Sequence, residues 1–252
     1  MPKIILASLF LLGAWAQALD FEPLGKGAFY AEADYQSVRY GIVKAHPEQV
    51  SLLWRDGEDK AYRSLSAAFS AVKESGRVPL MLMNAGIFTT AHTPAGLWVE
   101  QGEALVPLNR NKGKGNFHIE PNGVFSVTGG KARVETSAAF ARRKARADHA
   151  VQSGPMLIVN GKINKRFVKN LSSPYKRNAV CTTKKGDLLF VMTLRYQSEW
   201  PSFYRLGEAL LSFGCHHALY LDGSISDWFV KGKSGTFHWS NFVGIIAVTE
   251  LP

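Results

Sequence analysis

The sequence has 252 residues, of which 46% are hydrophobic, enough to form one large domain or two small ones around a normal core. Lys and Arg outnumber Asp and Glu by 30 to 20, for a formal net charge of +10. No repeat, low-complexity tract or linker divides the chain, which excludes a repeat protein and favours a single domain.

The first residues, MPKIILASLFLLGAWAQALD, predict a secretory signal. Lys3 precedes an apolar run from Ile4 to Ala16, and Ala16-Gln17-Ala18 is typical of a cleavage site. We expect cleavage after Ala18, with residues 19–252 as the mature domain. The run is too short to cross a membrane, and no later segment has the ~20 apolar residues that a spanning helix needs. The sequence therefore predicts a periplasmic or secreted protein without a membrane span.

Without Lys3 the chain keeps 29 basic against 20 acidic residues, so its net charge stays near +9. Such a balance favours anionic partners through the long-range field. An exported protein meets anionic glycans, phospholipid headgroups and phosphorylated polymers, so we expect no nucleic-acid partner. The densest basic run, ARRKARADHA at 141–150, is interpreted as a solvated helix face.

The N-terminal half predicts strands first and then a helix. The segments GAFYAEADYQSVRYGIVKAH (27–46) and QVSLLWRDGEDK (49–60) are typical of three strands with polar turns. YRSLSAAFSAVKESG (62–76) places its apolar residues on one helical face and ends at Gly76. The apolar strand VPLMLMNAGIF (78–88) then ends on Asn84-Ala85-Gly86.

Hairpins dominate the middle of the chain. GVFSVTGGKARVE (123–135) turns at Gly129-Gly130, and PMLIVNGKIN (155–164) turns at Asn160-Gly161. NAVCTTKKGDLLFVMTLR (178–195) predicts a third hairpin that turns near Lys185-Gly186. In the last third, a helix at 202–214, closed by Gly214, precedes the strands HHALYLD (216–222) and NFVGIIAVTE (241–250).

Together these elements predict a single α+β domain, with a mixed, hairpin-rich β-sheet flanked by a few helices. Helix-then-strand occurs twice, and each of those strands ends in a polar element with glycine, NAG (84–86) or DGS (222–224). Ligand sites of open α/β sheets gather at the C-terminal ends of strands. Cys181 and Cys215 either form a disulfide in an oxidising compartment or stay as two separately buried thiols.

Five segments combine polar groups and glycine beside apolar runs: NAGIF (84–88), GNFHIEPNGVF (115–125), QSGPMLIVNGKIN (152–164), RNAVC (177–181) and LYLDGSISDWF (219–229). Each by itself is explained by a turn or a strand start. Together, from about Phe29 to the C-terminus, they resemble the phosphodiester glycosidase family. The departures are Ala85 in place of a glycine, Ile87 in place of an aromatic residue, and the interruption of the terminal glycine run by Ser224 and Ile225.

The resemblance implies hydrolysis of a sugar-1-phosphodiester, with cleavage between the anomeric carbon and the bridging phosphate oxygen. An oxocarbenium-like transition state requires a carboxylate near the anomeric carbon. Asp222 is the first candidate, and Glu120 is the reserve. For Asp222 the alternative is a turn-capping aspartate that bonds the backbone around Gly223. Arg177 is the candidate that neutralises the leaving phosphate, with a surface arginine as its alternative.

The remaining candidates contact the substrate. Asn84 would hydrogen-bond sugar hydroxyls or position water. The other predicted substrate-binding residues are Asn178, Gln152, Ser153, Gly154, Gly86, Gly223 and Ser224. Asp227 either binds a ligand or is a surface charge beside Trp228.

The sequence contains no metal-binding motif, so we expect no metal and no cofactor. The predicted function is an exported hydrolase that cleaves a sugar-1-phosphodiester in a cell-envelope saccharide. A non-catalytic periplasmic protein that binds anionic saccharides is the alternative. A third interpretation is an esterase with Ser153 as nucleophile and His149 as base. The oligomeric state stays open.

Overall fold

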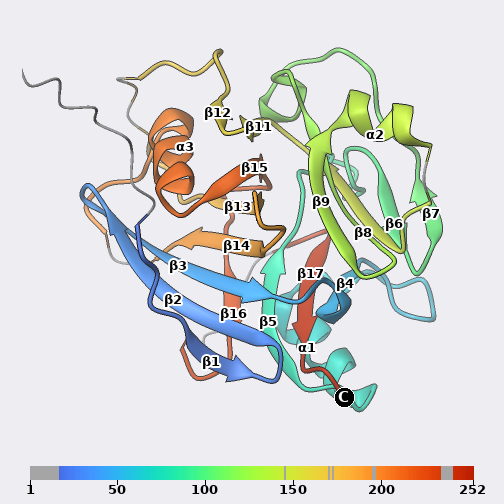
Figure 1. The fold of residues 1–252 in the computed structure, drawn as a ribbon. Helices are drawn as coiled ribbons and strands as arrows, with labels where there is room; N and C mark the ends of the chain where they lie inside the picture. Colours follow the sequence, from blue (N-terminus) through green and yellow to red (C-terminus); the bar gives the residue numbers. More distant parts are fainter. Residues whose placement is uncertain (1–16, 145, 170, 172, 195–196, 234–240) are drawn as a thin grey trace, which may run out of the picture.

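The strands of the described residues form three antiparallel sheets (Figure 1). The computed structural model describes residues 17–252 except 145, 170, 172, 195–196 and 234–240. The predicted signal segment therefore lies almost entirely outside the described residues. Within them, no helix is long and apolar enough to cross a membrane.

The largest sheet has eight strands, in the order β1-β2-β3-β14-β13-β15-β11-β12. Their bounds in chain order are β1 Glu22–Gly25, β2 Ala28–Tyr35, β3 Val38–Ala45, β11 Met156–Val159, β12 Lys162–Ile163, β13 Asn178–Thr183, β14 Leu188–Thr193 and β15 Cys215–Tyr220. Its central strands are buried on both faces. In β13, Val180 packs into one core while Ala179 and Cys181 pack into another, as the two-residue period of a strand requires.

Two smaller sheets complete the β structure. The five-stranded sheet has the order β7-β6-β10-β8-β9, and the four-stranded sheet has the order β16-β5-β17-β4. Their bounds are β4 Val50–Leu53, β5 Pro79–Asn84, β6 Trp98–Glu100, β7 Glu103–Val106, β8 Gly123–Thr128, β9 Lys131–Thr136, β10 His149–Ser153, β16 Trp228–Val230 and β17 Ile245–Thr249. The main core, which includes Phe125, Phe190 and Ile246, lies where the three sheets pack together.

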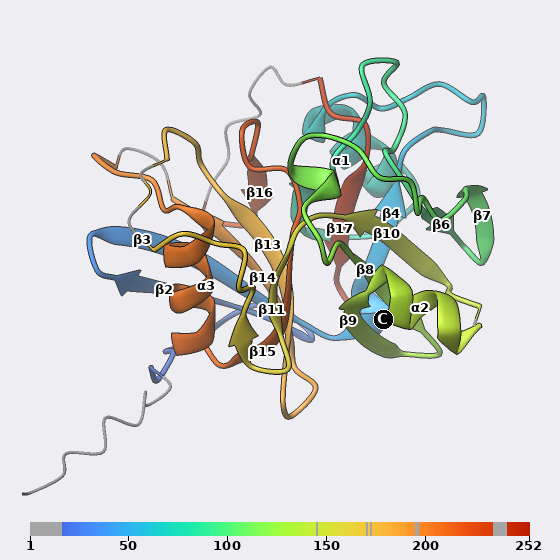
Figure 2. The ribbon, with the colours of Figure 1, turned by 90° about the horizontal axis from the view of Figure 1, so that it is seen from above.

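The described residues form three α-helices, which cover the sheets, and each begins at a side-chain cap. The helices are α1 Leu65–Glu74, α2 Ser137–Arg143 and α3 Phe203–Ser212, with the short 3-10 turns η1 Pro47–Gln49 and η2 Asn116–His118. Ser64, Thr136 and Ser202 accept hydrogen bonds from first-turn amides, which satisfies donors that a helix start leaves open. The helix α1 packs on β5, and α3 lies beside β11 and β15 (Figure 2).

The α+β class and the predicted hairpins are confirmed. The turns fall at Gly129-Gly130 and Asn160-Gly161. All four residues have positive φ, which glycine adopts readily, and Asn160 has φ 51°. Every described strand pairing is antiparallel, and the strands divide among three sheets. The prediction of one helix face over 141–150 was wrong: α2 ends at Arg143, and β10 begins at His149. Pairing of β10 with both β6 and β8 buries Ala150 and Val151, which overrides the helical propensity of the run.

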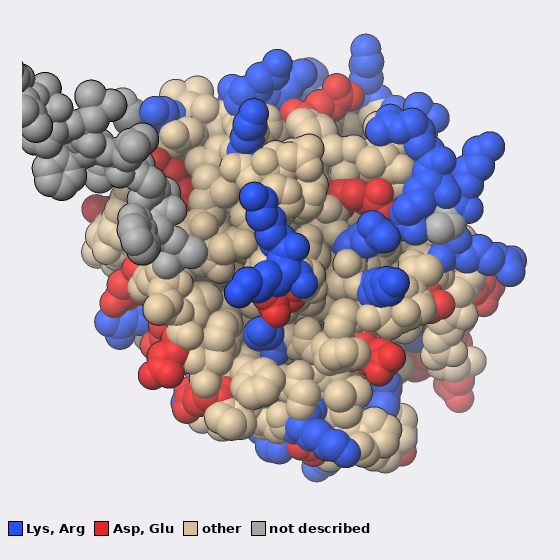
Figure 3. All heavy atoms as spheres, in the orientation of Figure 1, with Lys and Arg blue, Asp and Glu red and all other residues tan. Residues whose placement is uncertain are grey.

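The basic excess is visible on the surface. Figure 3 shows Lys and Arg side chains spread over one face, densest at its upper right, over α2. Several of them pair with carboxylates, such as Arg143 with Glu135 at 2.9 Å.

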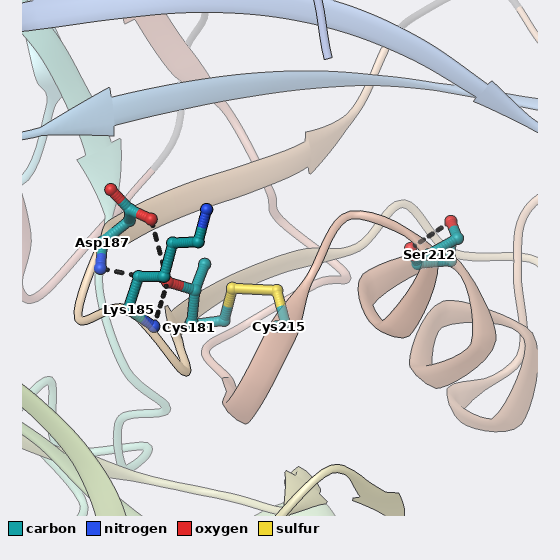
Figure 4. Close-up of a disulfide and its surroundings, with 7 residues drawn as sticks. Cys181, Lys185, Asp187, Ser212 and Cys215 are labelled. Carbon is teal, nitrogen blue, oxygen red and sulfur yellow. Dashed lines mark hydrogen bonds between the residues drawn. A yellow bond between two sulfur atoms is a disulfide. The ribbon is translucent and has the colours of Figure 1, made fainter. Parts of the chain in front are cut away.

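The two cysteines are bonded to each other. Cys181 of β13 and Cys215 of β15 form a disulfide across neighbouring strands, with their Cα atoms 5.7 Å apart (Figure 4). This resolves the alternative between a bridge and two separate thiols in favour of the bridge.

Candidate active site at the end of strand β15

The segment after β15 connects the sheets. It leaves the eight-stranded sheet at Tyr220 and enters the four-stranded sheet at Trp228, where β16 pairs with β5. The segment GPM at 154–156 likewise links β10 of the five-stranded sheet to β11 of the eight-stranded one. Asp222 therefore lies where all three sheets converge.

Two buried asparagines hold the backbone of Asp222. The Nδ2 of Asn84, at the end of β5, donates to the Asp222 carbonyl oxygen at 2.8 Å. The Oδ1 of Asn178, at the start of β13, accepts from the Asp222 amide at 3.0 Å. The side chains of Asn84 and Asn178 are 2% and 0% exposed, so both bonds are shielded from water. The peptide groups on either side of the Asp222 Cα are thus anchored to different sheets.

The same asparagines bind each other. The Nδ2 of Asn178 donates to the carbonyl oxygen of Asn84 at 3.0 Å and to its Oδ1 at 3.2 Å. The Oδ1 of Asn84 also accepts from the amide of Asp227 at 3.1 Å. Asp227 itself is buried and accepts from the Trp228 amide, so its interpretation as a surface charge was wrong. A connected polar network of this kind specifies a single arrangement of the strand ends.

The Asp222 carboxylate is partly accessible to solvent but poorly hydrated. Burial raises its pKa to about 6, while Ser224 and the positive charge of Arg177 act in the opposite direction. Ser224 is exposed, and its Oγ lies 3.5 Å from Asp222 Oδ1, a long contact. A carboxyl group with its pKa near 6 can exchange protons near neutral pH.

Arg177 is not a surface residue, because its side chain is only 6% exposed. Its guanidinium donates to the carbonyl of Pro201, to the hydroxyl of Tyr220 at 3.1 Å and to Ser173 Oγ at 2.6 Å. The ring of Phe203 lies against it, 4.5 Å from centroid to guanidinium carbon. These contacts hold one positive charge close enough to Asp222 to oppose the rise in its pKa.

Tyr220 is a functional candidate that sequence reasoning missed. Its buried hydroxyl accepts from Arg177 and, at 2.6 Å, from the amide of Gly223. A Cβ at Gly223 would lie 2.5 Å from that hydroxyl oxygen and 2.5 Å from the Lys176 carbonyl, so only glycine fits. Tyr220 and Asp222 stand two residues apart on an extended segment, a spacing that could have identified the tyrosine.

Residues at the end of β10 hold neighbouring backbone segments of the site by hydrogen bonds. Ser153 Oγ donates to the carbonyl of Leu221 at 2.8 Å and accepts from the Ile87 amide. Gln152 Oε1 accepts from the amides of Leu97 and Asn109, and its Nε2 donates to Asn109 O and Ser137 Oγ. All four hydrogen-bonding positions of this amide are therefore occupied within the protein.

Two further candidate glycines permit close backbone contacts. A Cβ at Gly86 would meet the Gln152 carbonyl at 2.9 Å, and one at Gly154 would meet the Phe117 carbonyl at 2.6 Å. Both therefore let loops pack against the end of β10.

The structure separates Glu120 from this network. Glu120 is exposed and lines a cleft whose lining residues do not include Asp222, Asn84 or Arg177. No described hydrogen bond joins its carboxylate to the Asp222 network.

The esterase geometry is absent. Ser153 and His149 occupy the two ends of β10, about 13 Å apart along an extended strand. Ser153 Oγ is buried and hydrogen-bonded, so no described base is placed to take its proton. Among the described residues, no three His, Cys, Asp or Glu side chains gather in a group that could hold a metal ion.

Comparisons with known proteins agree with the resemblance of the motifs. A profile of the phosphodiester glycosidase family matches residues 79–243, which include Asn84, Arg177 and Asp222. The uncharacterized protein YigE of Escherichia coli (strain K12) is 36% identical over 249 residues, covering 98% of this chain and 92% of that protein.

Solved structures with the same fold are more distant in sequence. The zebrafish N-acetylglucosamine-1-phosphodiester alpha-N-acetylglucosaminidase catalytic domain, auto-inhibited by its pro-peptide, has a TM-score of 0.61 at 15% identity, covering 92% of this chain and 85% of that one. A putative exported protein from Burkholderia pseudomallei K96243 has a TM-score of 0.54 at 13% identity, with coverages of 89% and 74%. At such identities the structural likeness concerns the fold alone. The profile match and the sequence relative show that the chain belongs to the phosphodiester glycosidase family.

Proposed function

We propose that this protein is an exported hydrolase that cleaves a sugar-1-phosphodiester in a cell-envelope saccharide. The observation that carries the proposal is the accessible Asp222 carboxylate, with a pKa near 6, on a backbone held by Asn84 and Asn178. Glycosidases use such a carboxylate beside the anomeric carbon. The family includes phosphodiester glycosidases, which supports the reaction class.

In this proposal the ionised Asp222 stabilises the oxocarbenium-like transition state or activates the attacking water. The rigid backbone fixes the distance between the carboxylate and the sugar, because positional error of about 1 Å is costly for catalysis. The departing phosphodiester is a weak base and needs charge neutralisation more than a proton. In this proposal Arg177 supplies that charge from its buried position, where three of its five N–H donors bind protein groups.

Of the other candidates, one is proposed to contact the substrate and the rest to hold the backbone of the site. Ser224, which is exposed beside Asp222, is proposed to contact the sugar. Asn84, Asn178, Ser153 and Gln152 are proposed to act mainly through the backbone that they hold. The glycines at 86, 154 and 223 keep the strand ends close together. Glu120 stays the reserve carboxylate.

The proposed location is the periplasm or the extracellular space. The Cys181–Cys215 disulfide fits an oxidising compartment, and the Burkholderia relative in fold is named as an exported protein. Detection of a mature N-terminus after Ala18 in the exported fraction would test the signal prediction.

The test of the reaction is the release of free N-acetylglucosamine from a short α-linked sugar-1-phosphodiester by the purified mature protein. Asp222→Asn is compared with Asp34→Asn, which removes an exposed carboxylate from β2. We expect release by the parent and by Asp34→Asn, and none by folded Asp222→Asn. Release by both variants would contradict the role assigned to Asp222, and Glu120→Gln would then test the reserve carboxylate. A protein that binds the compound with no release would instead be the saccharide-binding alternative.

A neutral α-glycoside of the same sugar tests the role of Arg177. Since this substrate has no phosphate charge to neutralise, we expect its hydrolysis to be much slower than that of the phosphodiester. Equal rates on the two substrates would contradict the role assigned to Arg177.

A further inference from the structure

A basic cleft has lining residues that do not belong to the Asp222 network, and that network does not explain it. The cleft has a volume of about 940 Å³ and is bordered by the loop before η2, the end of η2 and the segment at β12. Its cationic residues are Arg110, Lys112, Lys162, Lys165 and Arg166. We call this the anion cleft. Its volume lies in the upper part of the range of ligand pockets in proteins.

The charges of the anion cleft are not neutralised by the protein. All five cationic side chains are exposed, and none makes a salt bridge within the part of the chain that the structure describes. Glu120 is the one carboxylate among the lining residues. Elsewhere on the surface, comparable cations such as Lys44, Arg143 and Arg205 are paired with acidic partners.

Buried amides hold the walls of the cleft in place. Gln152, which is 1% exposed, binds both the amide and the carbonyl of Asn109 in one wall. Asn164, which is 7% exposed, donates to the carbonyls of Glu120 and Met156 and accepts from the Arg166 amide. These bonds form within the protein, so the cleft does not depend on a ligand for its shape.

Two consecutive residues of β10, Gln152 and Ser153, make hydrogen bonds to the wall of the anion cleft and to the segment of Asp222, respectively. Gln152 holds the cleft wall, and the next residue, Ser153, donates to the carbonyl of Leu221 directly before Asp222. The end of β10 therefore supports both the backbone beside Asp222 and one wall of the anion cleft.

We propose that the anion cleft binds the further phosphate groups of an extended, phosphate-linked saccharide whose terminal sugar contacts Asp222. The choice of substrate class depends on the proposed function, but the binding does not depend on turnover. Five cations match several phosphates, since a single phosphodiester carries one charge. Lys and Arg are suited to phosphate oxygens, and Glu120 adds an acceptor for hydroxyl groups, which favours a saccharide over a bare phosphate chain.

The experiment measures direct binding in the Asp222→Asn background, so that the probe is not consumed. The probe is a synthetic oligo(glycerol phosphate) that carries N-acetylglucosamine. Its binding is measured by titration calorimetry. The cleft variant combines Lys162→Gln, Lys165→Gln and Arg166→Gln. The matched control combines Lys131→Gln, Lys184→Gln and Lys185→Gln, which are exposed lysines outside the cleft. Both triple variants lose three positive charges.

We expect the cleft variant to bind the probe at least about tenfold more weakly, because each exposed ion pair contributes a factor of about two to five. The control should change affinity by less than about threefold. Equal losses in the two variants, or no loss in either, would overturn the proposal. Cleft-dependent binding to phosphatidylglycerol vesicles that is tighter than binding to the probe would assign the cleft to lipid headgroups and overturn the saccharide assignment.

The two proposals fail separately. Cleft-dependent binding in a protein that releases no sugar would retain the anion cleft and remove the hydrolase. Release of sugar from the short phosphodiester, with no effect of the cleft variant on the long probe, would do the reverse.

Discussion

Asp222 combines a backbone that is firmly held with a side chain that is poorly solvated. Its peptide groups bind Asn84 and Asn178, while burial raises the pKa of its carboxyl to about 6. A simple turn-capping aspartate would accept backbone N–H bonds, which lower the pKa. The contact of the Asp222 carboxylate in the described residues is with Ser224 Oγ at 3.5 Å, not with a backbone amide, so the carboxyl does not cap the turn around Gly223.

The raised pKa has a consequence for stability. Between about pH 4 and pH 6 the folded protein keeps a proton on Asp222 that the unfolded chain has lost, so this group's contribution to stability falls as pH rises through that window. At pH 7 the ionised carboxylate costs about 1–3 kcal/mol. Asp222→Asn should remove that cost while it abolishes turnover.

Urea unfolding of the parent and Asp222→Asn at pH 4 and pH 7 measures this effect. The variant's advantage in the free energy of unfolding should be small at pH 4 and larger at pH 7. An advantage that does not change with pH would show that the carboxyl of Asp222 titrates normally in the folded protein.

Tyr220 links Arg177 to the Asp222 segment through one oxygen atom. Tyr220→Phe leaves the ring in place but removes the acceptor for the Gly223 amide and for Arg177 Nη1. A buried donor without a partner costs about 1–3 kcal/mol, so we expect destabilisation of that size and a lower kcat. Tyr40→Phe, in the same core, is the control for loss of a tyrosine hydroxyl. Parent-like stability and kcat in Tyr220→Phe would exclude this link.

Among the elements, β13 and β15 are neighbouring inner strands of the eight-stranded sheet and supply several residues of the Asp222 network. Asn178 and Arg177 lie at the start of β13, and Tyr220 ends β15. The Cys181–Cys215 disulfide joins these two strands near their other ends. Their register is thus secured by a covalent bond at one end and by polar contacts at the other.

Removal of the disulfide should destabilise this pair of strands. The bridge closes a loop between residues 34 apart, for which the chain-entropy relation gives about 3–4 kcal/mol. We expect the free energy of unfolding of the double variant Cys181→Ala, Cys215→Ala, measured by urea titration, to be lower by that amount. Reductant should lower the midpoint of the parent and leave the double variant unchanged. A parent midpoint that is insensitive to full reduction would contradict the expectation.

Over the molecule as a whole, the formal charge of +10 creates a field that attracts anions. If the substrate is a phosphodiester, kcat/KM should fall as salt rises from about 0.01 to 0.15 M, because the screening length shortens from about 30 to 8 Å. Hydrolysis of a neutral α-glycoside, where measurable, should stay constant over the same range. The opposite pattern would indicate that the basic surface serves another partner.

Much of the fold is encoded locally and could be predicted. The apolar spacing of Leu65, Ala68 and Val72 predicts α1, and the glycine turns at 129–130 and 160–161 predict two hairpins. These patterns depend on neighbours a few residues away, which a sequence displays directly. The motif resemblance also identified Asp222, Asn84 and Arg177 as candidates, and the structure brings Asp222 and Asn84 into contact.

Contacts between distant segments could not be predicted in this way. Asn84 and Asn178 are 94 residues apart, and they meet only because β5 and β13 belong to sheets that converge. The packing of the sheets likewise buries Arg177 and places the Tyr220 hydroxyl against the Gly223 amide. It also makes a strand of residues 149–153. The pKa of Asp222 has the same origin, since desolvation sums over every group packed around the carboxyl. Local periodicity specifies which elements form, whereas the packing of whole sheets specifies which side chains share a site.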